Sequence, residues 1–301
     1  MDARFRNQAG LISNDKLKAT SFCVVGAGAI GSAFVIALSK MGARKITVYD
    51  FDTLEDHNLA NQLYPKSYLG KPKVEALKHY AADFGDCDIT AINEPWTPDN
   101  AVKADVVVAA VDNMDVRSAI YRYYMFHVIQ LRGDLIRGYG GDADSLIYPM
   151  RPMAFVDGRM GALVYRSFLV DTSSDAQVKH YESTLHTQAE GSQERCGEKS
   201  IIYTVYGVAG AMCDLVKQWL MNSDNRPTEI QYDYFNHDVT LVKHMEPKYE
   251  VIQGGEDDGS NGSGAKDVAE GGEHTVQDEN VKKEVDSRQE DVQDHPVISG
   301  V

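Results

Sequence analysis

Several features that would mark a secreted, membrane-spanning or zinc-binding protein are missing from this sequence. Its four cysteines form no C-x-x-C pair, so we expect neither a zinc site nor a disulfide framework. No apolar run approaches the roughly 18 residues of a membrane span, and the opening residues MDARFRNQAG hold no apolar stretch for a signal peptide. These absences predict a soluble, cytoplasmic chain with no membrane partner.

Positive charge is scarce as well. The 45 Asp and Glu residues outnumber the 30 Lys and Arg residues, for a net charge of −15. Residues 251–301 contain 4 bases against 13 acids, a net −9, which leaves −6 for the preceding 250 residues. This tail has no Phe, Trp or Tyr, so it cannot bury enough apolar surface to offset the entropy of ordering. We therefore expect a disordered acidic tail, and no nucleic acid among the partners.

A glycine-rich turn follows the first apolar segment. Residues 20–25, TSFCVV, predict a strand, and Gly26, Gly28 and Gly31 follow it in G-x-G-x-x-G spacing before a helical pattern that runs to Met41. Such glycines let the backbone approach a phosphate at a helix N-terminus. The turn predicts a nucleotide site that includes Gly26, Gly28, Ala29, Ile30 and Gly31. The alternative is a turn that serves strand-helix packing alone.

The rest of the pattern predicts a Rossmann-like α/β fold, with a mostly parallel sheet, flanking helices and a C-terminal antiparallel extension. A second strand, KITVYD, ends at Asp50, an acid placed to accept hydrogen bonds from a ribose, and a later strand, 105–111, ends at Asp112. Because the carboxyl ends of parallel strands share one rim, both acids should meet there. The other expected elements are helices at 73–80, 116–128 and 201–220, a strand at 88–92, strand-like pieces around Leu135 and at 146–148, a polar connection over 153–199, and a hairpin at 230–242.

Six motifs occur in a fixed order: RFRNQ, GAGAIGS, YDFDTLEDHNLANQ, LGKPK, AAVDNMDVR and ERCGEKSIIYTVYGVAG. Through them, residues 4 to 245 resemble the ubiquitin-activating-enzyme-like superfamily, the ThiF, MoeB and HesA group of ATP-dependent adenylating proteins. The resemblance implies an ATP- and Mg²⁺-dependent adenylyltransferase. It would activate the C-terminal carboxylate of a ubiquitin-like or sulfur-carrier protein or peptide, and would act as a homodimer. We expect an adenylation domain over 1–250, with a nucleotide half at about 18–115 and a carrier-binding half at about 116–250, and the tail over 251–301.

The same resemblance implies roles for individual residues. Asp50 would hold the ribose, and Asn58 would bind the nucleotide or its phosphates. Lys73 would neutralise phosphate charge, Asp112 would hold magnesium, and Arg117 would either orient the rim or bind phosphate. The other residues expected to line the nucleotide are Asp52, Asn61, Gln62 and Asn113.

Cys196 lies in ERCGEKS, where the resemblance places a reactive cysteine. Its neighbours Arg195 and Lys199, together with the start of the following helix, would favour the thiolate. Thioester or persulfide chemistry at Cys196 is therefore one expectation, and a surface residue without chemistry is the other. Cys23 and Cys213 fall in predicted core elements and are expected to be packing residues.

The sequence departs from the family pattern at two positions. Asn7 and Asn61 stand where the family usually has arginines that contact the ATP phosphates. Losing one charged contact of this kind costs about 10²-fold or more in rate. A non-catalytic relative that binds nucleotide or carrier is therefore the second hypothesis. If the nearby Arg4 and Arg6 took over the missing phosphate contacts, the first hypothesis, an active adenylyltransferase, would still hold.

A third hypothesis is an NAD-linked oxidoreductase. The glycine turn and Asp50 fit such an enzyme, because dinucleotide-binding folds use both. Asn58, Lys73 and the Asp112 rim would then have no explanation.

Overall fold

The computed structural model describes residues 3–84, 86–125, 154–189, 200–223 and 226–243. The chain divides into two units, Met1–Lys248 and Tyr249–Val301, and every described residue belongs to the first. The strand-like pieces expected around Leu135 and at 146–148, the last residues of the predicted helix 116–128, and Cys196 all lie outside the described residues.

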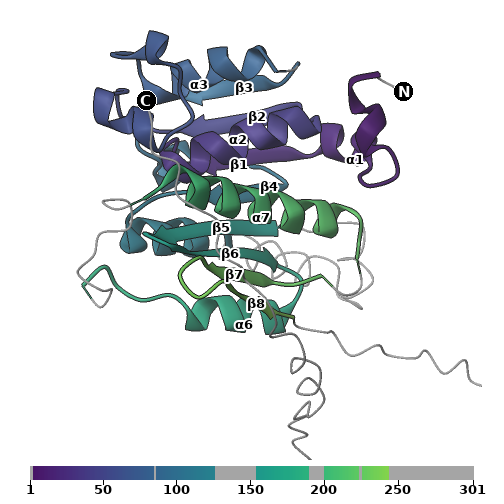
Figure 1. Cartoon of the computed structure of the whole chain (residues 1–301). Helices are drawn as coiled ribbons and strands as arrows, with labels where there is room; N and C mark the ends of the chain where they lie inside the picture. The colour runs from purple at the N-terminus through teal and green to yellow at the C-terminus, as the bar shows by residue number, and fades with distance from the viewer. Residues whose placement is uncertain (1–2, 85, 126–153, 190–199, 224–225, 244–301) are drawn as a thin grey trace, which may run out of the picture. The chain divides into compact units, whose positions relative to one another are not determined.

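The described strands form one sheet in the order β3-β2-β1-β4-β5-β6-β7-β8 (Figure 1). Neighbours from β3 to β5 are parallel, and those from β5 to β8 are antiparallel. This arrangement confirms the Rossmann-like fold with its antiparallel C-terminal extension. The strands are β1 (Ser21–Val25), β2 (Lys45–Tyr49), β3 (Asp88–Ile92), β4 (Val106–Ala109), β5 (Ala154–Gly161), β6 (Val164–Asp171), β7 (Glu229–Asp233) and β8 (Asp238–Val242).

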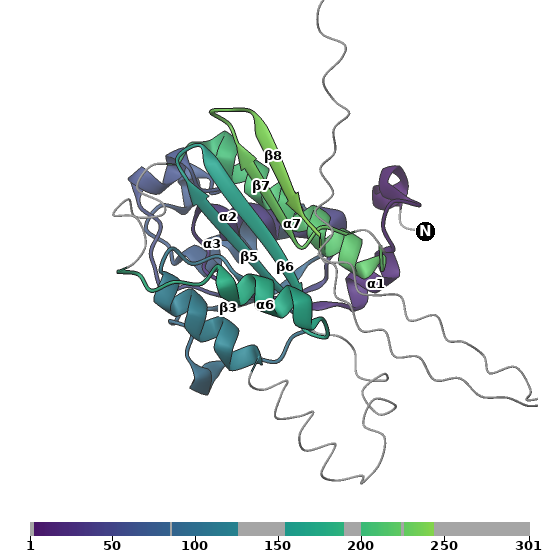
Figure 2. The ribbon, with the colours of Figure 1, turned by 90° about the horizontal axis from the view of Figure 1, so that it is seen from below.

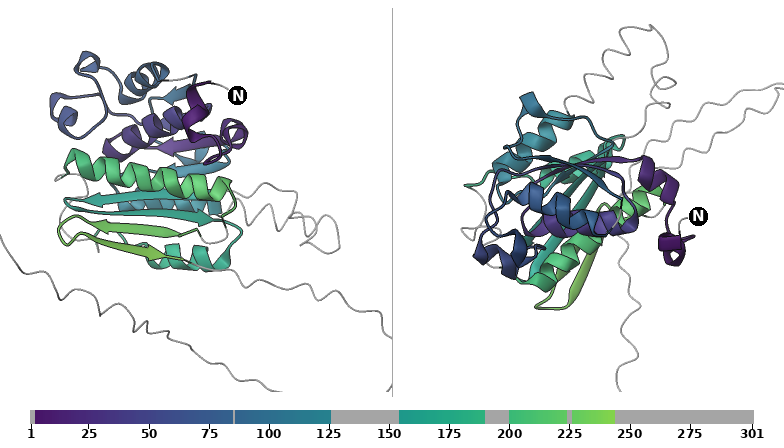
Figure 3. Two further views of the ribbon diagram at one scale, coloured as in Figure 1. Left: turned by 45° about the vertical axis from the view of Figure 1, so that its right-hand side comes forward. Right: turned by 90° about the horizontal axis from the view of Figure 1, so that it is seen from above.

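Helices cover both faces of the sheet (Figure 2, Figure 3). One hydrophobic core packs α2, α3 and α7 against one face, and a second packs α6 and the helix at residues 114–125 against the other. The helices are α1 (Asn14–Ala19), α2 (Ala29–Met41), α3 (Lys73–Ala82), α6 (Asp175–Ser183) and α7 (Ile202–Leu220), and the short 3-10 helices are η1 (Ala3–Gln8), η2 (Asp56–Ala60), η3 (Lys66–Tyr68) and η4 (Pro98–Asn100). No helix in these described segments is long and apolar enough to span a membrane.

The parallel strands are apolar on both sides because both of their faces are buried. In β1, Phe22 and Val24 enter one core, while Cys23 and Val25 enter the other. Burial raises the pKa of the Cys23 thiol to about 12, and burial of Cys213 in α7 has the same effect. Both cysteines are packing residues, as predicted.

The polar connection predicted over residues 153–199 is wrong. This stretch contains the strands β5 and β6 and the helix α6. The sequence AFVDGRMG of β5 reads as polar because of Asp157 and Arg159, yet both side chains are buried. They pair with each other, at 2.7 Å between Arg159 Nε and Asp157 Oδ2, so the strand lies inside the protein despite its charges.

Candidate functional site

Two glycines of the turn between β1 and α2 are required by packing. Gly26 has φ of +99°, and a Cβ there would lie 2.5 Å from the carbonyl oxygen of Ala110. A Cβ at Gly31 would lie 1.9 Å from the carbonyl oxygen of Gly26. Neither position tolerates a side chain without moving backbone, so these two glycines by themselves say nothing about a ligand.

Gly28 is different. It is the N-cap of α2, its φ is −75°, and no side chain caps the helix there. A Cβ at this position would meet nothing within 4 Å. The space around this position is therefore open, and the N–H groups of the first turn of α2, which begins with Ala29 and Ile30, have no partner within the helix. This is the geometry in which a helix N-terminus accepts an anion.

Asp50 ties the end of β2 to the glycine turn. Its carboxylate accepts the backbone N–H of Ala27 at 2.7 Å and that of Asp52 at 2.8 Å, one on each oxygen. Burial raises the pKa of Asp50, although these N–H groups and the Lys73 ammonium oppose the rise. A carboxylate oxygen can accept a second hydrogen bond, so each oxygen retains capacity for a ligand hydroxyl.

Lys73 is a buried cation at the same end of the sheet. It is the first residue of α3, its side chain is 7% exposed, and its Nζ lies 2.8 Å from Asp52 Oδ2. Asp52 is half exposed, so solvent or a ligand can reach the outer side of this pair. A cation in the first turn of a helix opposes the helix dipole, which means that local helix preferences do not account for Lys73.

The segment between β2 and α3 holds three more of the predicted residues. Asn58 is buried, and its side-chain oxygen accepts the N–H of Glu55 at 2.9 Å, which closes a capping box on η2. Asn61 donates to the hydroxyl of Ser200, next to the start of α7. The Oε1 atom of Gln62 is buried and has no hydrogen-bond partner among the described residues. A ligand N–H or O–H would satisfy it.

The rim beyond β4 carries Asp112 and Asn113. Asn113 caps the helix at 114–125, because its side-chain oxygen accepts the N–H groups of Asp115 and Val116 at 2.9 and 3.0 Å. Asp112 has no side-chain hydrogen bond or ion pair to any residue that the structure describes. The residue is exposed, so solvent or a ligand can reach its carboxylate.

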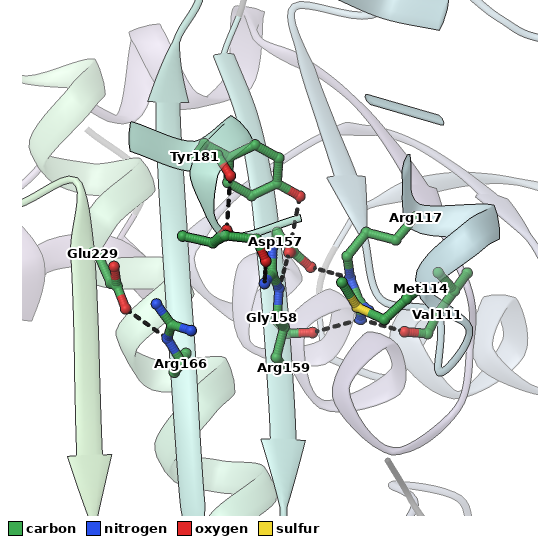
Figure 4. A network of polar contacts seen from close by, with 10 residues as sticks. Val111, Met114, Arg117, Asp157, Gly158, Arg159, Arg166, Tyr181 and Glu229 are labelled. Atoms are coloured by element: carbon green, nitrogen blue, oxygen red, sulfur yellow. Dashed lines mark hydrogen bonds and ion pairs between the residues drawn. The ribbon is translucent and has the colours of Figure 1, made fainter. Parts of the chain in front are cut away.

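Arg117 lies below this rim and is 1% exposed. Its guanidinium donates to Asp157 Oδ1 at 2.7 Å, to the carbonyl oxygen of Val111, and to that of Gly158 at 3.3 Å (Figure 4). The sequence left two roles open for Arg117. This burial and these contacts favour orienting the rim over contact with a phosphate.

The metal-binding side chains at this rim suit a magnesium ion that arrives bound to a substrate. Within the described ranges, no three His, Cys, Asp or Glu residues are grouped so that they could hold a metal. Mg²⁺ is commonly bound through one or two carboxylates, with water and substrate phosphates as its other ligands. A single carboxylate at Asp112 fits that pattern and does not fit a resident metal cage.

The N-terminal residues lie far from this rim in their own chain. Gln8, at the end of η1, donates to the carbonyl oxygen of Met41, the last residue of α2. The glycine turn is at the other end of α2, about 18 Å away at 1.5 Å per residue. Arg4 forms an ion pair with Asp86. Neither Arg4 nor Arg6 therefore replaces a phosphate arginine within the same chain.

Sequence reasoning missed Asp157, Arg159 and Ser200. The available signal was the pair of charged residues, Asp157 and Arg159, two positions apart inside an otherwise apolar stretch. Their other partners, Arg117 and Thr184, lie far away in the sequence, so no local pattern reveals these contacts.

The fold and the rim define the class of this protein, a Rossmann-like α/β domain with a switch point between β1 and β4, where such folds bind ligands. The model of the ThiF family matches residues 3–251, and the chain belongs to this family.

Curated relatives match part of the chain. The tRNA threonylcarbamoyladenosine dehydratase 2 of Saccharomyces cerevisiae is 32% identical over 140 residues, which cover 44% of this chain and 30% of that protein. The molybdopterin-synthase adenylyltransferase of Haemophilus influenzae is 31% identical over 114 residues, 36% of this chain and 47% of that protein. These matches span less than half of either relative.

Among solved structures, E. coli MccB has a similar fold. The crystal structure with AMPCPP and MccA has a TM-score of 0.57 at 14% identity, over 78% of this chain and 67% of that one. A second crystal structure of MccB contains ATP, with a TM-score of 0.51 over the same shares of the two chains. At this identity the likeness shows a common fold.

Proposed function

We propose that this protein is an ATP-dependent adenylyltransferase that activates the C-terminal carboxylate of a ubiquitin-like or sulfur-carrier protein or of a peptide. In this reaction a carboxylate oxygen attacks the α-phosphorus of ATP, an acyl-adenylate forms, and pyrophosphate leaves. The adenylyltransferase among the relatives and the ATP in an MccB crystal support the proposal. The observation that carries it is the open space at Gly28, because packing requires Gly26 and Gly31 but not Gly28.

In this proposal the rim residues divide the work. The first turn of α2 binds phosphate, Asp50 accepts a ribose hydroxyl, and Lys73 exchanges part of its contact with Asp52 for a phosphate oxygen. The nucleotide-lining residues are Gly26, Gly28, Ala29, Ile30, Gly31, Asp50, Asp52, Asn58, Asn61, Gln62, Lys73, Asp112 and Asn113. Asp112 would hold Mg²⁺, which neutralises charge on the phosphates when it is bound. Arg117 would position the rim from below.

Gly28→Ala is expected to keep the fold and to weaken ATP binding. The added methyl group has no contact within 4 Å and φ is already negative, so the melting temperature should not change. We expect the methyl group to crowd a phosphate bound at the N-terminus of α2, and losing one hydrogen bond to a charged acceptor costs about 1.5–3 kcal/mol, or about 10- to 150-fold in affinity. Thermal melts and calorimetric titration with ATP measure the two effects.

Gly31→Ala is the matched control. Its Cβ would collide with the Gly26 carbonyl oxygen, so this variant should lose stability. Wild-type ATP affinity in Gly28→Ala would contradict a phosphate site at this helix.

Pyrophosphate exchange into ATP tests the reaction itself. Exchange that depends on a candidate carrier or peptide would exclude the non-catalytic alternative, which rests on Asn7 and Asn61 standing where the family usually has arginines that contact the ATP phosphates. ATP binding without exchange for every partner tested would favour that alternative. NADH binding without ATP binding would support an oxidoreductase instead.

We further infer a homodimer in the cytoplasm. Because η1 is far from the rim of its own chain, Arg4 or Arg6 can supply phosphate contacts only to a second copy. Sedimentation equilibrium that finds monomers alone would exclude this arrangement. Unchanged exchange in a double Arg4→Ala, Arg6→Ala variant would exclude the two arginines.

For Cys196 we propose a thioester or persulfide link to the activated partner. In the first case the thiolate attacks the carbonyl carbon of the acyl-adenylate, and AMP leaves as the C–O bond to its phosphate breaks. In the second case a persulfide donor first transfers its outer sulfur to Cys196, and that sulfur attacks the same carbon, again with AMP as the leaving group. Cys196 lies four residues before Ser200, whose hydroxyl contacts Asn61 of the nucleotide segment. We expect a thiol-sensitive adduct with the partner, seen on non-reducing gels in the presence of ATP. Cys196→Ala should abolish this adduct, and Cys87→Ala should retain it because burial raises the pKa of that thiol. An adduct that survives in Cys196→Ala would exclude the role.

A further inference from the structure

A buried cluster beneath the rim contains more positive than negative charge. Asp157 on β5 is fully buried and accepts hydrogen bonds from Arg117 Nε at 2.7 Å, from Arg159 Nε at 2.7 Å and from the Tyr181 hydroxyl at 3.0 Å (Figure 4). One guanidinium would suffice to neutralise one carboxylate. Burying a second charge carries a desolvation penalty, so Arg159 calls for an explanation other than pairing with Asp157.

One side of the cluster reaches the rim through Arg117. Its guanidinium holds the carbonyl oxygen of Val111, the residue immediately before Asp112. The backbone N–H of Arg117 also donates to the carbonyl oxygen of Asn113 at 3.0 Å. The Arg117 side chain thus fixes the residue before Asp112, and its backbone N–H makes the ordinary helical bond to the residue after it. The guanidinium is in turn held by Asp157.

The other side reaches the rim through Arg159. Its guanidinium donates to the carbonyl oxygen of Thr184 at 2.9 Å and to the Thr184 hydroxyl at 3.1 Å, just after α6 ends. Four residues later, Gln188 Oε1 accepts the N–H of Met114 at 2.8 Å, and the Gln188 N–H donates to Asp115 Oδ1 at 3.1 Å. The chain therefore returns to the first turn of the helix that follows Asp112.

We infer that Arg159 is a positioning residue for the Asp112 carboxylate, and so for the Mg²⁺ that arrives with ATP. The inference rests on the proposed function, because it assigns Asp112 to magnesium. Arg159 contacts both supports of the rim, Asp157 on one side and Thr184 on the other. Its planar fork makes both contacts at once, and a lysine cannot reproduce that geometry.

The test measures ATP affinity by calorimetry with excess Mg²⁺ and with EDTA. In wild type, Mg²⁺ should tighten binding. Changes to residues that support a metal ligand typically cost about 10- to 100-fold in metal affinity. We expect Arg159→Lys and Arg159→Met to lose most of the Mg²⁺-dependent gain while keeping their ATP affinity in EDTA.

Arg166→Lys is the matched control. Arg166 on β6 lies directly opposite Arg159 in the antiparallel register and also binds an almost fully buried acid, with Nε 2.7 Å from Glu229 Oε1. Its contacts with Glu229 and with the ring of Phe168 do not lead to the rim, so its Mg²⁺-dependent gain should match that of wild type. Gln188→Ala removes the side chain that accepts the N–H of Met114, and Gln188 is exposed. We expect this variant to fold and to lose a smaller part of the Mg²⁺-dependent gain, so it tests the inference even if the Arg159 variants do not fold.

Three results would overturn the inference. The first is a full Mg²⁺-dependent gain in the Arg159 variants and in Gln188→Ala. The second is an equal loss in Arg166→Lys, because the effect would then be a general one on the fold. The third is a wild-type protein that binds no ATP at all. This result would also contradict the proposed function, whereas the first two results would not affect it.

Discussion

Lys73→Ala is expected to lower the rate of pyrophosphate exchange by about 10²- to 10³-fold, the usual cost of losing one preorganised group that faces developing charge. The Lys73 ammonium is almost fully buried at the rim, and its partner Asp52 is half exposed. After the substitution Asp52 can be hydrated, so no charge is left buried without a partner. The loss should therefore appear in exchange and in ATP affinity, with little change in melting temperature.

Lys71→Ala is the control for this experiment. Lys71 is exposed two residues earlier in the same motif, and its ammonium lies over the ring of Tyr68 at 5.4 Å. Exchange in this variant should be close to that of wild type. Equal exchange rates in the Lys71 and Lys73 variants would remove Lys73 from the proposed machinery.

Asp157→Ala is expected to lower the free energy of unfolding by about 3–5 kcal/mol, as happens when one partner of a buried ion pair is removed. The variant leaves the guanidiniums of Arg117 and Arg159 buried without their shared carboxylate. Urea denaturation monitored by circular dichroism measures the change. The steep cost arises from the two buried cations that remain.

Asp86→Ala provides a comparison with the same chemistry at the surface. Asp86 also pairs with two arginines, Arg4 and Arg44, but its side chain is 58% exposed. Solvent screens such pairs, and they contribute little to stability. A loss in Asp86→Ala as large as that in Asp157→Ala would show that burial is not the cause.

The ion pairs of Asp157 with Arg117 and Arg159 predict that the free energy of unfolding depends on pH. Burial alone would raise the pKa of Asp157, but Arg117 and Arg159 outweigh it and hold that pKa below its ordinary value of 3.8. The stabilisation is therefore complete above the ordinary pKa and is lost as the pH falls through the lowered value of the folded state. The difference in unfolding free energy between wild type and Asp157→Ala should shrink only in strongly acidic solution.

The parts of the fold that sequence predicts are those with local signals. The unit from β1 through the glycine turn to α2 was predictable because an apolar run, three spaced glycines and a helical pattern follow each other directly. Gly28 could be recognised as part of a motif. Only the structure distinguishes it from Gly26 and Gly31, because that distinction depends on the position of the Ala110 backbone and on the open space before α2.

The parts that sequence missed depend on contacts between distant residues. The polar residues of β5 concealed a strand. Arg117, which shares the Asp157 carboxylate with Arg159, comes 40 residues earlier in the sequence, so no local pattern shows that these charges are paired and buried. Arg117 itself was found through its motif, but its burial was not, since burial depends on β5 packing beside β4. Asn58 and Asn61 were predicted only as ligand residues. In the structure Asn58 closes the capping box on η2, and Asn61 contacts Ser200.

Calorimetric titration of the wild-type protein with ATP and with NADH, each in the presence of Mg²⁺, tests the central claim most directly. The proposed site predicts saturable ATP binding that Mg²⁺ strengthens and that Lys73→Ala weakens, with no binding of NADH. Saturable NADH binding together with no heat from ATP would contradict a nucleotide site built for adenylation.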